Sequence, residues 1–177
     1  RAKIDEMSAT ELQTPAEKIV KASPFEQTEG HVVSVNKQLT RYGGNQITQT
    51  VSQEALTASV RVTQDGRTVR LDLESLTAEA VSAAYKKLNV LLKALPKAKE
   101  LVEVLAPGAN YTDPKRKLPA MPSAQFAADT IQKAAALAKT NGLETSGIYS
   151  IEQKVTAYSN SKGLRLFDQV SDSEFSC

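Results

Sequence analysis

The chain has 177 residues, of which 41% are hydrophobic and 24% are charged, and its 22 basic and 20 acidic residues leave a net charge of +2. These values are typical of one ordinary folded domain or two small ones. A charge balance this even argues against nucleic-acid binding, which needs a basic stripe. The one dense basic run, PKRK at residues 114–117, is interpreted as a solvated linker.

The cysteine content and the lack of long apolar runs indicate the cellular compartment. Cys177 is the only cysteine, which rules out an internal disulfide and favours a reducing environment. No apolar run approaches the roughly 20 residues needed to cross a bilayer, and the first residues lack the apolar core of a signal peptide. We therefore expect a cytoplasmic protein without membrane contact. The sequence starts with Arg and stops in a strand-like pattern, so it is interpreted as part of a longer chain.

The first part of the chain predicts a short helix followed by a sheet. The run TPAE at residues 14–17 has a capping threonine, a proline suited to the first helical position and a glutamate that completes a capping box. From Gly30 onward, apolar and polar residues alternate as in strands, with a further strand expected over residues 47–51. Two alternating runs, ASVRV and VRLDL, flank Asp65-Gly66, which predicts a β-hairpin.

Two longer helices are expected after this hairpin. Thr77 is placed to cap the first, whose apolar residues recur at three- and four-residue steps up to Leu91 and Leu92. Ser123 is placed to cap the second, which has an alanine-rich stripe and should end at Asn141-Gly142. Three strand-like segments follow, namely GIYSIEQ, KVTAYSN and GLRLFDQ.

The order of these elements predicts an α+β fold. Residues 1–105 should form an N-terminal domain in which an amphipathic helix packs on an antiparallel sheet. Residues 106–122 are rich in proline and polar residues and are interpreted as a linker. Residues 123–177 should begin a central domain, a second helix-plus-antiparallel-sheet unit that is truncated.

Few residues of the chain are suited to catalysis. His31 is the only histidine, so with one cysteine a zinc site of three or four such ligands cannot be assembled. The sequence has no Gly-x-Ser-x-Gly elbow and no Walker loop, and Gly43-Gly44 lacks the context of a dinucleotide site. Asp72 and Glu74 share one strand face, where solvated carboxylates are expected. We assign no catalytic residue and no metal ligand to this chain.

The order of the motifs resembles the N-terminal region of the TldD/PmbA family, also called the modulator-of-DNA-gyrase or peptidase U62 family. RYGGNQITQ at residues 41–49 is followed by LTASVRVTQDGRTV at residues 56–69 and by a helix opening with Leu76-Thr77. In the second half, TAYSNSKGL at residues 156–164 looks like part of the family's central region. The likeness covers most of the chain from about residue 31 to its end.

The resemblance implies a cytoplasmic protein more than twice this length that acts as a zinc-dependent peptidase in peptide processing or proteolysis. Proteolytic members carry a His-Glu-x-x-x-His zinc motif in the later part of the chain, and no such motif occurs here. One alternative is that this chain is a scaffold, forming the dimer interface and the substrate cleft, while catalysis and zinc belong to a C-terminal domain absent from it. The other is a non-catalytic PmbA-like partner that binds peptides.

The implied partners are a peptide substrate and a second subunit, as a homodimer or as a heterodimer with a related family member. Arg41, Asn45 and Gln49 could line a peptide-accepting cleft. Alternatively, Asn45 supports the turn through a side-chain hydrogen bond while Arg41 and Gln49 decorate the sheet. Asn160 and Ser161 have the same two interpretations, contact with substrate or turn chemistry.

Overall fold

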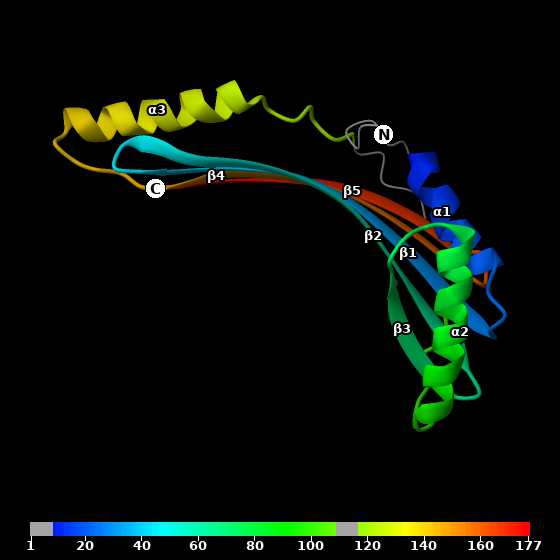
Figure 1. Cartoon of the computed structure of the whole chain (residues 1–177). Helices are drawn as coiled ribbons and strands as arrows, with labels where there is room; N and C mark the ends of the chain where they lie inside the picture. The colour runs from blue at the N-terminus through cyan, green and yellow to red at the C-terminus, as the bar shows by residue number, and fades with distance from the viewer. Residues whose placement is uncertain (1–8, 109–116) are drawn as a thin grey trace. The chain divides into compact units, whose positions relative to one another are not determined.

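The computed structural model describes residues 9–108 and 117–177, and these form the α+β fold predicted from the sequence (Figure 1). In chain order the elements are α1 (Ala9–Lys21), β1 (Gln27–Gly43), β2 (Gln46–Gln64), β3 (Arg67–Leu73), α2 (Ala78–Ala94), α3 (Ala124–Thr140), β4 (Gly147–Asn160) and β5 (Arg165–Ser176). The PKRK run and the expected 106–122 linker fall partly on residues 109–116, which lie outside the described residues.

The strands form an antiparallel five-stranded sheet with the order β3-β2-β1-β4-β5. β2 pairs with β3 in a register that places Ala58 opposite Leu73. β4 lies beside β1, and the Ser161 N–H donates to the Thr28 carbonyl at 2.9 Å where these strands meet. GIYSIEQ and KVTAYSN form the single strand β4, so the strands expected in a second unit extend the first sheet.

The chain divides into two compact units. The first unit comprises Arg1–Ser34, Leu56–Lys115 and Val155–Asp168, and the second comprises Val35–Ala55, Arg116–Lys154 and Gln169–Cys177. Each unit combines residues from both sides of segment 106–122, because β1, β2, β4 and β5 each contribute residues to both units. The division into an N-terminal domain 1–105 and a central domain 123–177 stays a prediction.

Two tight turns join the first three strands. Gly44 and Asn45 have φ angles of 56° and 62°, and Asp65 and Gly66 have φ angles of 48° and 78°. Positive φ at both central residues is the signature of a type I′ turn, whose twist suits a two-residue hairpin. The Asp65-Gly66 hairpin is therefore confirmed. The separate strand predicted over residues 47–51 is instead the first part of the 19-residue strand β2.

Helix α1 begins at Ala9, earlier than the predicted start at Thr14, so that Pro15 lies inside the helix. A proline in a helix interior costs about 3 kcal/mol. Tertiary contacts of the preceding turn offset this cost. Leu12 is completely buried, and the Gln13 amide donates a 3.0 Å hydrogen bond to the backbone of β4.

The core of the first unit lies between the sheet and helices α1 and α2 (Figure 1). Val32 on β1, Val60 and Val62 on β2, and Leu88 on α2 are completely buried. Burial of each such side chain stabilises the fold by roughly 1.5–3 kcal/mol. Leu91 was expected on the buried stripe of α2, but it is 37% exposed because it lies at the edge of that stripe.

The caps predicted for the two longer helices are confirmed, whereas Thr14, predicted to cap the first helix, lies inside α1. The Thr77 hydroxyl oxygen accepts a hydrogen bond from the Ala80 N–H at 3.2 Å at the start of α2. The Ser123 hydroxyl oxygen accepts one from the Phe126 N–H at 3.1 Å at the start of α3. Asn141 ends α3, as predicted, and a stripe of buried small and apolar residues runs along this helix in the second unit.

Gly30 on β1 permits the close approach of α1 to the sheet. A Cβ atom there would lie 2.6 Å from the Ala16 carbonyl oxygen and 3.2 Å from Ile19 Cβ. We expect Gly30→Ala to lower the free energy of unfolding by about 1–3 kcal/mol, because the helix must move away from the strand. Urea denaturation measures this loss beside Gly108→Ala, where an added Cβ meets nothing within 4 Å. Equal stability of the two variants would contradict the close packing.

Candidate functional site

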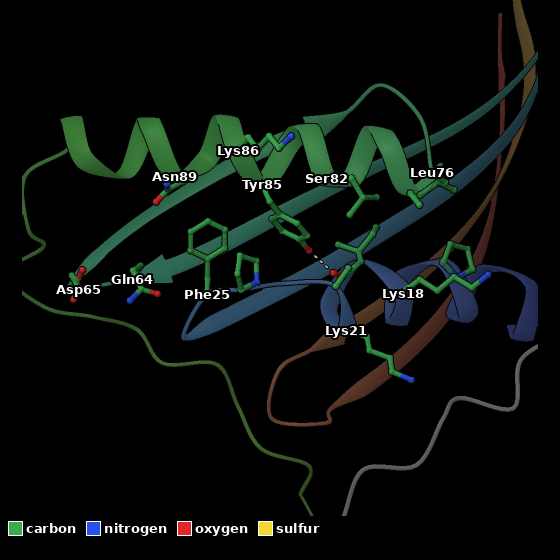
Figure 2. A pocket seen from close by; sticks show the side chains of 16 residues that line it. Lys18, Lys21, Phe25, Gln64, Asp65, Leu76, Ser82, Tyr85, Lys86 and Asn89 are labelled. Atoms are coloured by element: carbon green, nitrogen blue, oxygen red, sulfur yellow. Dashed lines mark hydrogen bonds between the residues drawn. The ribbon is translucent and has the colours of Figure 1, made fainter.

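A groove of about 1070 Å³ opens between α1 and α2 in the first unit (Figure 2). The end of α1 forms one wall and the first turns of α2 form the other. Gln64 and Asp65, at the turn between β2 and β3, lie at one end of the groove, and Leu76 lies at the opposite end (Figure 2). The lining between them includes the apolar side chains of Ile19 and Val81.

Tyr85 reaches across the groove from α2 and connects its two walls. Its hydroxyl donates a hydrogen bond to the carbonyl of Ile19 on α1 (Figure 2). Its ring packs against Phe25, with ring centroids 5.8 Å apart and planes tilted by 58°. Burial of the hydroxyl raises the pKa of Tyr85 to about 12, and a hydrogen bond with Ser23 partly opposes this rise. Tyr85 therefore stays protonated and acts as a fixed donor beneath the groove.

Three lysines line the rim of the groove, Lys18 and Lys21 on α1 and Lys86 on α2 (Figure 2). All three are exposed, and none forms an ion pair with a carboxylate of residues 9–108 or 117–177. Asp65 is the only acidic side chain among the described residues that line the groove. The arrangement combines an apolar floor with a positive rim, which suits an anionic amphipathic ligand better than a cationic one.

A polar cluster crosses three adjacent strands of the first unit. The Glu29 carboxylate on β1 forms an ion pair with Arg61 on β2 and accepts a 2.7 Å hydrogen bond from the Tyr158 hydroxyl on β4. The Glu29 side chain is only 17% exposed. Burial, together with the hydrogen bond to Glu29, raises the pKa of Tyr158 to about 12. Both carboxylate oxygens have partners, so the cluster links strands rather than forming an acid–base dyad.

Arg41, Asn45 and Gln49 all lie in the second unit, around the turn between β1 and β2. Asn45 Nδ2 donates to the Leu143 carbonyl at 3.1 Å, and its Oδ1 accepts from the Thr145 N–H at 2.9 Å. The Asn45 N–H also donates to the Thr145 carbonyl at 3.2 Å. Arg41 and Gln49 are exposed. Asn45 thus joins the β1–β2 turn to residues 143–145, whereas contact of these residues with substrate stays a prediction.

Asn160 and Ser161 lie in the first unit, where they stabilise the turn between β4 and β5. The Asn160 Oδ1 accepts hydrogen bonds from the N–H groups of Lys162 and Leu164 at 3.0 and 3.1 Å. Its Nδ2 donates to the Leu105 carbonyl at 2.8 Å, and its side chain is almost completely buried. Ser161 Oγ accepts from a backbone N–H at the start of β1 at 3.1 Å. The five predicted residues therefore fall into two groups, one in each unit.

The residues of the groove were not found from the sequence. Tyr85 lies within the apolar stripe of α2, where an aromatic residue indicates a core position. Lys18 and Lys21 lie at a spacing that places them on one helix face, which is a weak signal because exposed lysines are common there. The only sequence signal was the pairing of an amphipathic helix with basic residues on its polar edge.

We expect substitution of Asn45 to destabilise the second unit. Asn45→Ala should lower the free energy of unfolding by about 1–3 kcal/mol, because alanine is strained at φ 62° and the partners in residues 143–145 lose their hydrogen bonds. Asn45→Gly tolerates this φ angle and should lose only about 1 kcal/mol. Thermal unfolding and amide exchange at Thr145 measure both effects. If the Thr145 amide in Asn45→Ala exchanged as slowly as in the wild type, the hydrogen bonds of the Asn45 side chain would contribute nothing to stability.

Within residues 9–108 and 117–177, no group of three His, Cys, Asp or Glu side chains could hold a metal ion. His31 lies on β1, and Cys177 is an exposed thiol. Over the same ranges, no helix has the length and apolar character needed to cross a membrane. Zinc in the full-length protein stays a prediction.

No family model and no curated protein matches the chain. Its fold is similar to that of TldE from Thermococcus kodakarensis, with a TM-score of 0.74 and 18% identity over 92% of this chain and 36% of that one. A proposed modulator of DNA gyrase from Thermotoga maritima gives a TM-score of 0.71 and 14% identity, over 83% of this chain and 34% of that one. A proposed modulator of DNA gyrase from Bacteroides thetaiotaomicron gives 0.63 and 16%, over 94% and 39%.

The chain spans only 34–39% of the length of these solved structures. At 14–18% identity, the similarity establishes the fold. The chain therefore has the fold of a part of TldE and of these proposed gyrase modulators, which confirms, at the level of the fold, its resemblance to the TldD/PmbA family.

Proposed function

We propose that this chain is the scaffold portion of a TldD/PmbA-type zinc-dependent peptidase of the cytoplasm. It would comprise the N-terminal region and the start of the central region, while hydrolysis belongs to a C-terminal domain outside this chain. The observation that carries the proposal is the fold match, in which 92% of this chain corresponds to 36% of TldE. In the C-terminal domain, zinc would polarise the scissile carbonyl and activate water.

The scaffold would wall a peptide cleft and contribute to a homodimer or to a heterodimer with a related protein. Arg41 and Gln49 have exposed side chains that are available to a peptide backbone or carboxylate. Asn45 would position the turn between Arg41 and Gln49 through its hydrogen bonds to Leu143 and Thr145. Asn160 and Ser161 would position the separate turn between β4 and β5. Arg41→Ala should therefore raise KM for a peptide substrate more than it lowers kcat.

The test is the intact mass and the zinc content of the native gene product, measured on one sample. We expect a mass well above 19.1 kDa, about one zinc per chain, and peptide hydrolysis that a chelator abolishes. A native chain of only 19.1 kDa would overturn the proposal. A larger protein that holds no zinc would favour the second candidate function.

The second candidate is a non-catalytic partner that binds extended peptides by strand addition. β5 and β3 are the outer strands of the sheet, so each has one edge whose backbone groups could pair with a peptide. In this case a bound peptide should slow amide exchange along one outer strand of the full-length protein. Unchanged exchange in both strands at saturating peptide would exclude strand addition.

A further inference from the structure

We propose that the groove between α1 and α2 binds an acidic amphipathic peptide segment of a partner protein. The apolar side chains of the segment would lie in the groove, and its carboxylates would pair with Lys18, Lys21 and Lys86. This inference goes beyond the proposed function, because none of the five candidate substrate contacts lines the groove and no hydrolysis is required.

The size and the walls of the groove favour a peptide segment. Its volume of about 1070 Å³ lies just above the roughly 300–1,000 Å³ typical of small-molecule pockets. Two helices form the walls, and Pro24, Phe25 and Leu76, none of which is fully buried, provide apolar surface in the lining. Grooves of this kind accept the apolar face of an amphipathic segment. Tyr85 holds the walls together, so the site is formed before a ligand arrives.

The charges around the groove favour an acidic occupant. Lys18 and Lys21 lie on one side and Lys86 on the other, and none of the three forms an ion pair with a carboxylate of the described residues (Figure 2). A basic segment would be repelled by this rim, whereas carboxylates would be attracted to it. Asp65 lies at one end of the groove and should fix the direction of the bound segment, because the acidic residues of the segment should avoid that end.

The binding test uses the full-length native protein and a fluorescein-labelled synthetic peptide of 14 residues, with Leu at helical spacing and Glu between. Fluorescence anisotropy should show that this peptide binds roughly tenfold or more tightly than an analogue in which Gln replaces Glu. An analogue with Lys in place of Glu should not bind measurably. Because the rim is exposed, binding of the Glu peptide should weaken as salt is raised from 0.05 to about 0.5 M.

Matched variants locate the binding site. The double substitution Lys18→Glu with Lys86→Glu should weaken binding roughly tenfold or more, whereas Lys87→Glu, on the same helix but outside the groove, should not. Ser82→Trp places a bulky side chain at the exposed wall of the groove and should abolish binding. Its control is Ala83→Trp, which lies outside the groove. Circular dichroism checks that each variant is folded.

Several outcomes would overturn the proposal. These are equal affinity for the Glu and Gln peptides, no binding at millimolar peptide, or binding that Ser82→Trp leaves unchanged. Displacement of the peptide by dodecanoate, with the same sensitivity to the lysine substitutions, would assign the groove to small anionic amphiphiles. Self-association that Ser82→Trp abolishes in sedimentation would assign it to a second copy. Zinc content and hydrolysis are read separately, so failure of this inference is distinct from failure of the proposed function.

Discussion

Replacing Glu29 by alanine should lower the free energy of unfolding by about 2–3 kcal/mol. The substitution removes the acceptor for both the Arg61 guanidinium and the Tyr158 hydroxyl. A hydrogen bond to a charged group contributes about 1.5–3 kcal/mol, and an unpaired partner that stays buried adds its desolvation cost. The value stays below that of a fully buried ion pair, because the Arg61 side chain is 35% exposed and partly rehydrates.

Urea denaturation at neutral pH measures this loss against Glu17→Ala. Glu17 on α1 pairs with Arg165 at 3.2 Å, but the two side chains are 37% and 65% exposed. Such a surface pair contributes about 0–1 kcal/mol, so the control should be close to wild type. A double-mutant cycle of Glu29→Ala and Arg61→Ala should give a coupling of about 1 kcal/mol or more. If Glu29→Ala and Glu17→Ala lowered the free energy of unfolding equally, the polar cluster would contribute no more to stability than an exposed ion pair.

Raising the pH from 10 to 12 should destabilise the protein steeply through Tyr85. The unfolded tyrosine ionises near pH 10.0, whereas burial raises the pKa of Tyr85 in the folded chain to about 12. Between these values the unfolded state binds fewer protons than the folded state, so stability is complete below pH 10 and falls as pH rises towards 12. One such group contributes at most about 1.4 kcal/mol per pH unit. Tyr158 shifts in the same direction and adds to the loss.

Denaturation curves at pH 9, 10 and 11 measure the slope, and Tyr85→Phe should reduce it. The same variant should lose about 1 kcal/mol at pH 7, because the Ile19 carbonyl loses its donor. Tyr158→Phe is the comparison variant, since it should remove only the part of the slope that Tyr158 of the polar cluster contributes. Absorbance of tyrosinate near 295 nm follows the ionisation directly. An unchanged slope in Tyr85→Phe would mean that this hydroxyl does not control the alkaline transition.

Local features of the fold could be predicted from the sequence because they depend on neighbouring residues. Asp65-Gly66 specifies a type I′ turn by itself, since few other residues tolerate positive φ at both positions. Thr77 and Ser123 cap the helices that follow them, because the cap bonds only to the next turn. The order of such motifs was enough to indicate the family whose fold the chain has.

Features that depend on distant residues could not be predicted. The start of α1 was placed too late because Pro15 signals a helix start locally, whereas burial of Leu12 extends the helix in the opposite direction. The joining of β4 to β1 depends on pairing between segments far apart in the chain, and no local pattern records it.

The candidate sites show the same limit. The hydrogen bonds that the Asn160 side chain accepts from Lys162 and Leu164 lie within its own turn, so turn chemistry could predict them. The Asn45 side chain instead bonds to Leu143 and Thr145, which are distant in the sequence. The groove required knowledge that α1 and α2 lie on one face of the sheet, since its lysines belong to two helices. The Glu29 cluster likewise combines three strands, and only the sheet order brings them together.

Because β4 pairs with β1, the sheet cannot be completed until late in the synthesis of the chain. Thr28 and Ser161, which bond where these strands meet, are separated by 133 positions in the chain. Ribosomes add roughly 5–20 residues per second, so β1 waits on the order of ten seconds before β4 leaves the ribosome. During that interval the nascent β1-β2-β3 hairpins have an open edge, which other chains could pair with. We therefore expect the yield of folded protein to depend on chaperones that hold this edge during translation.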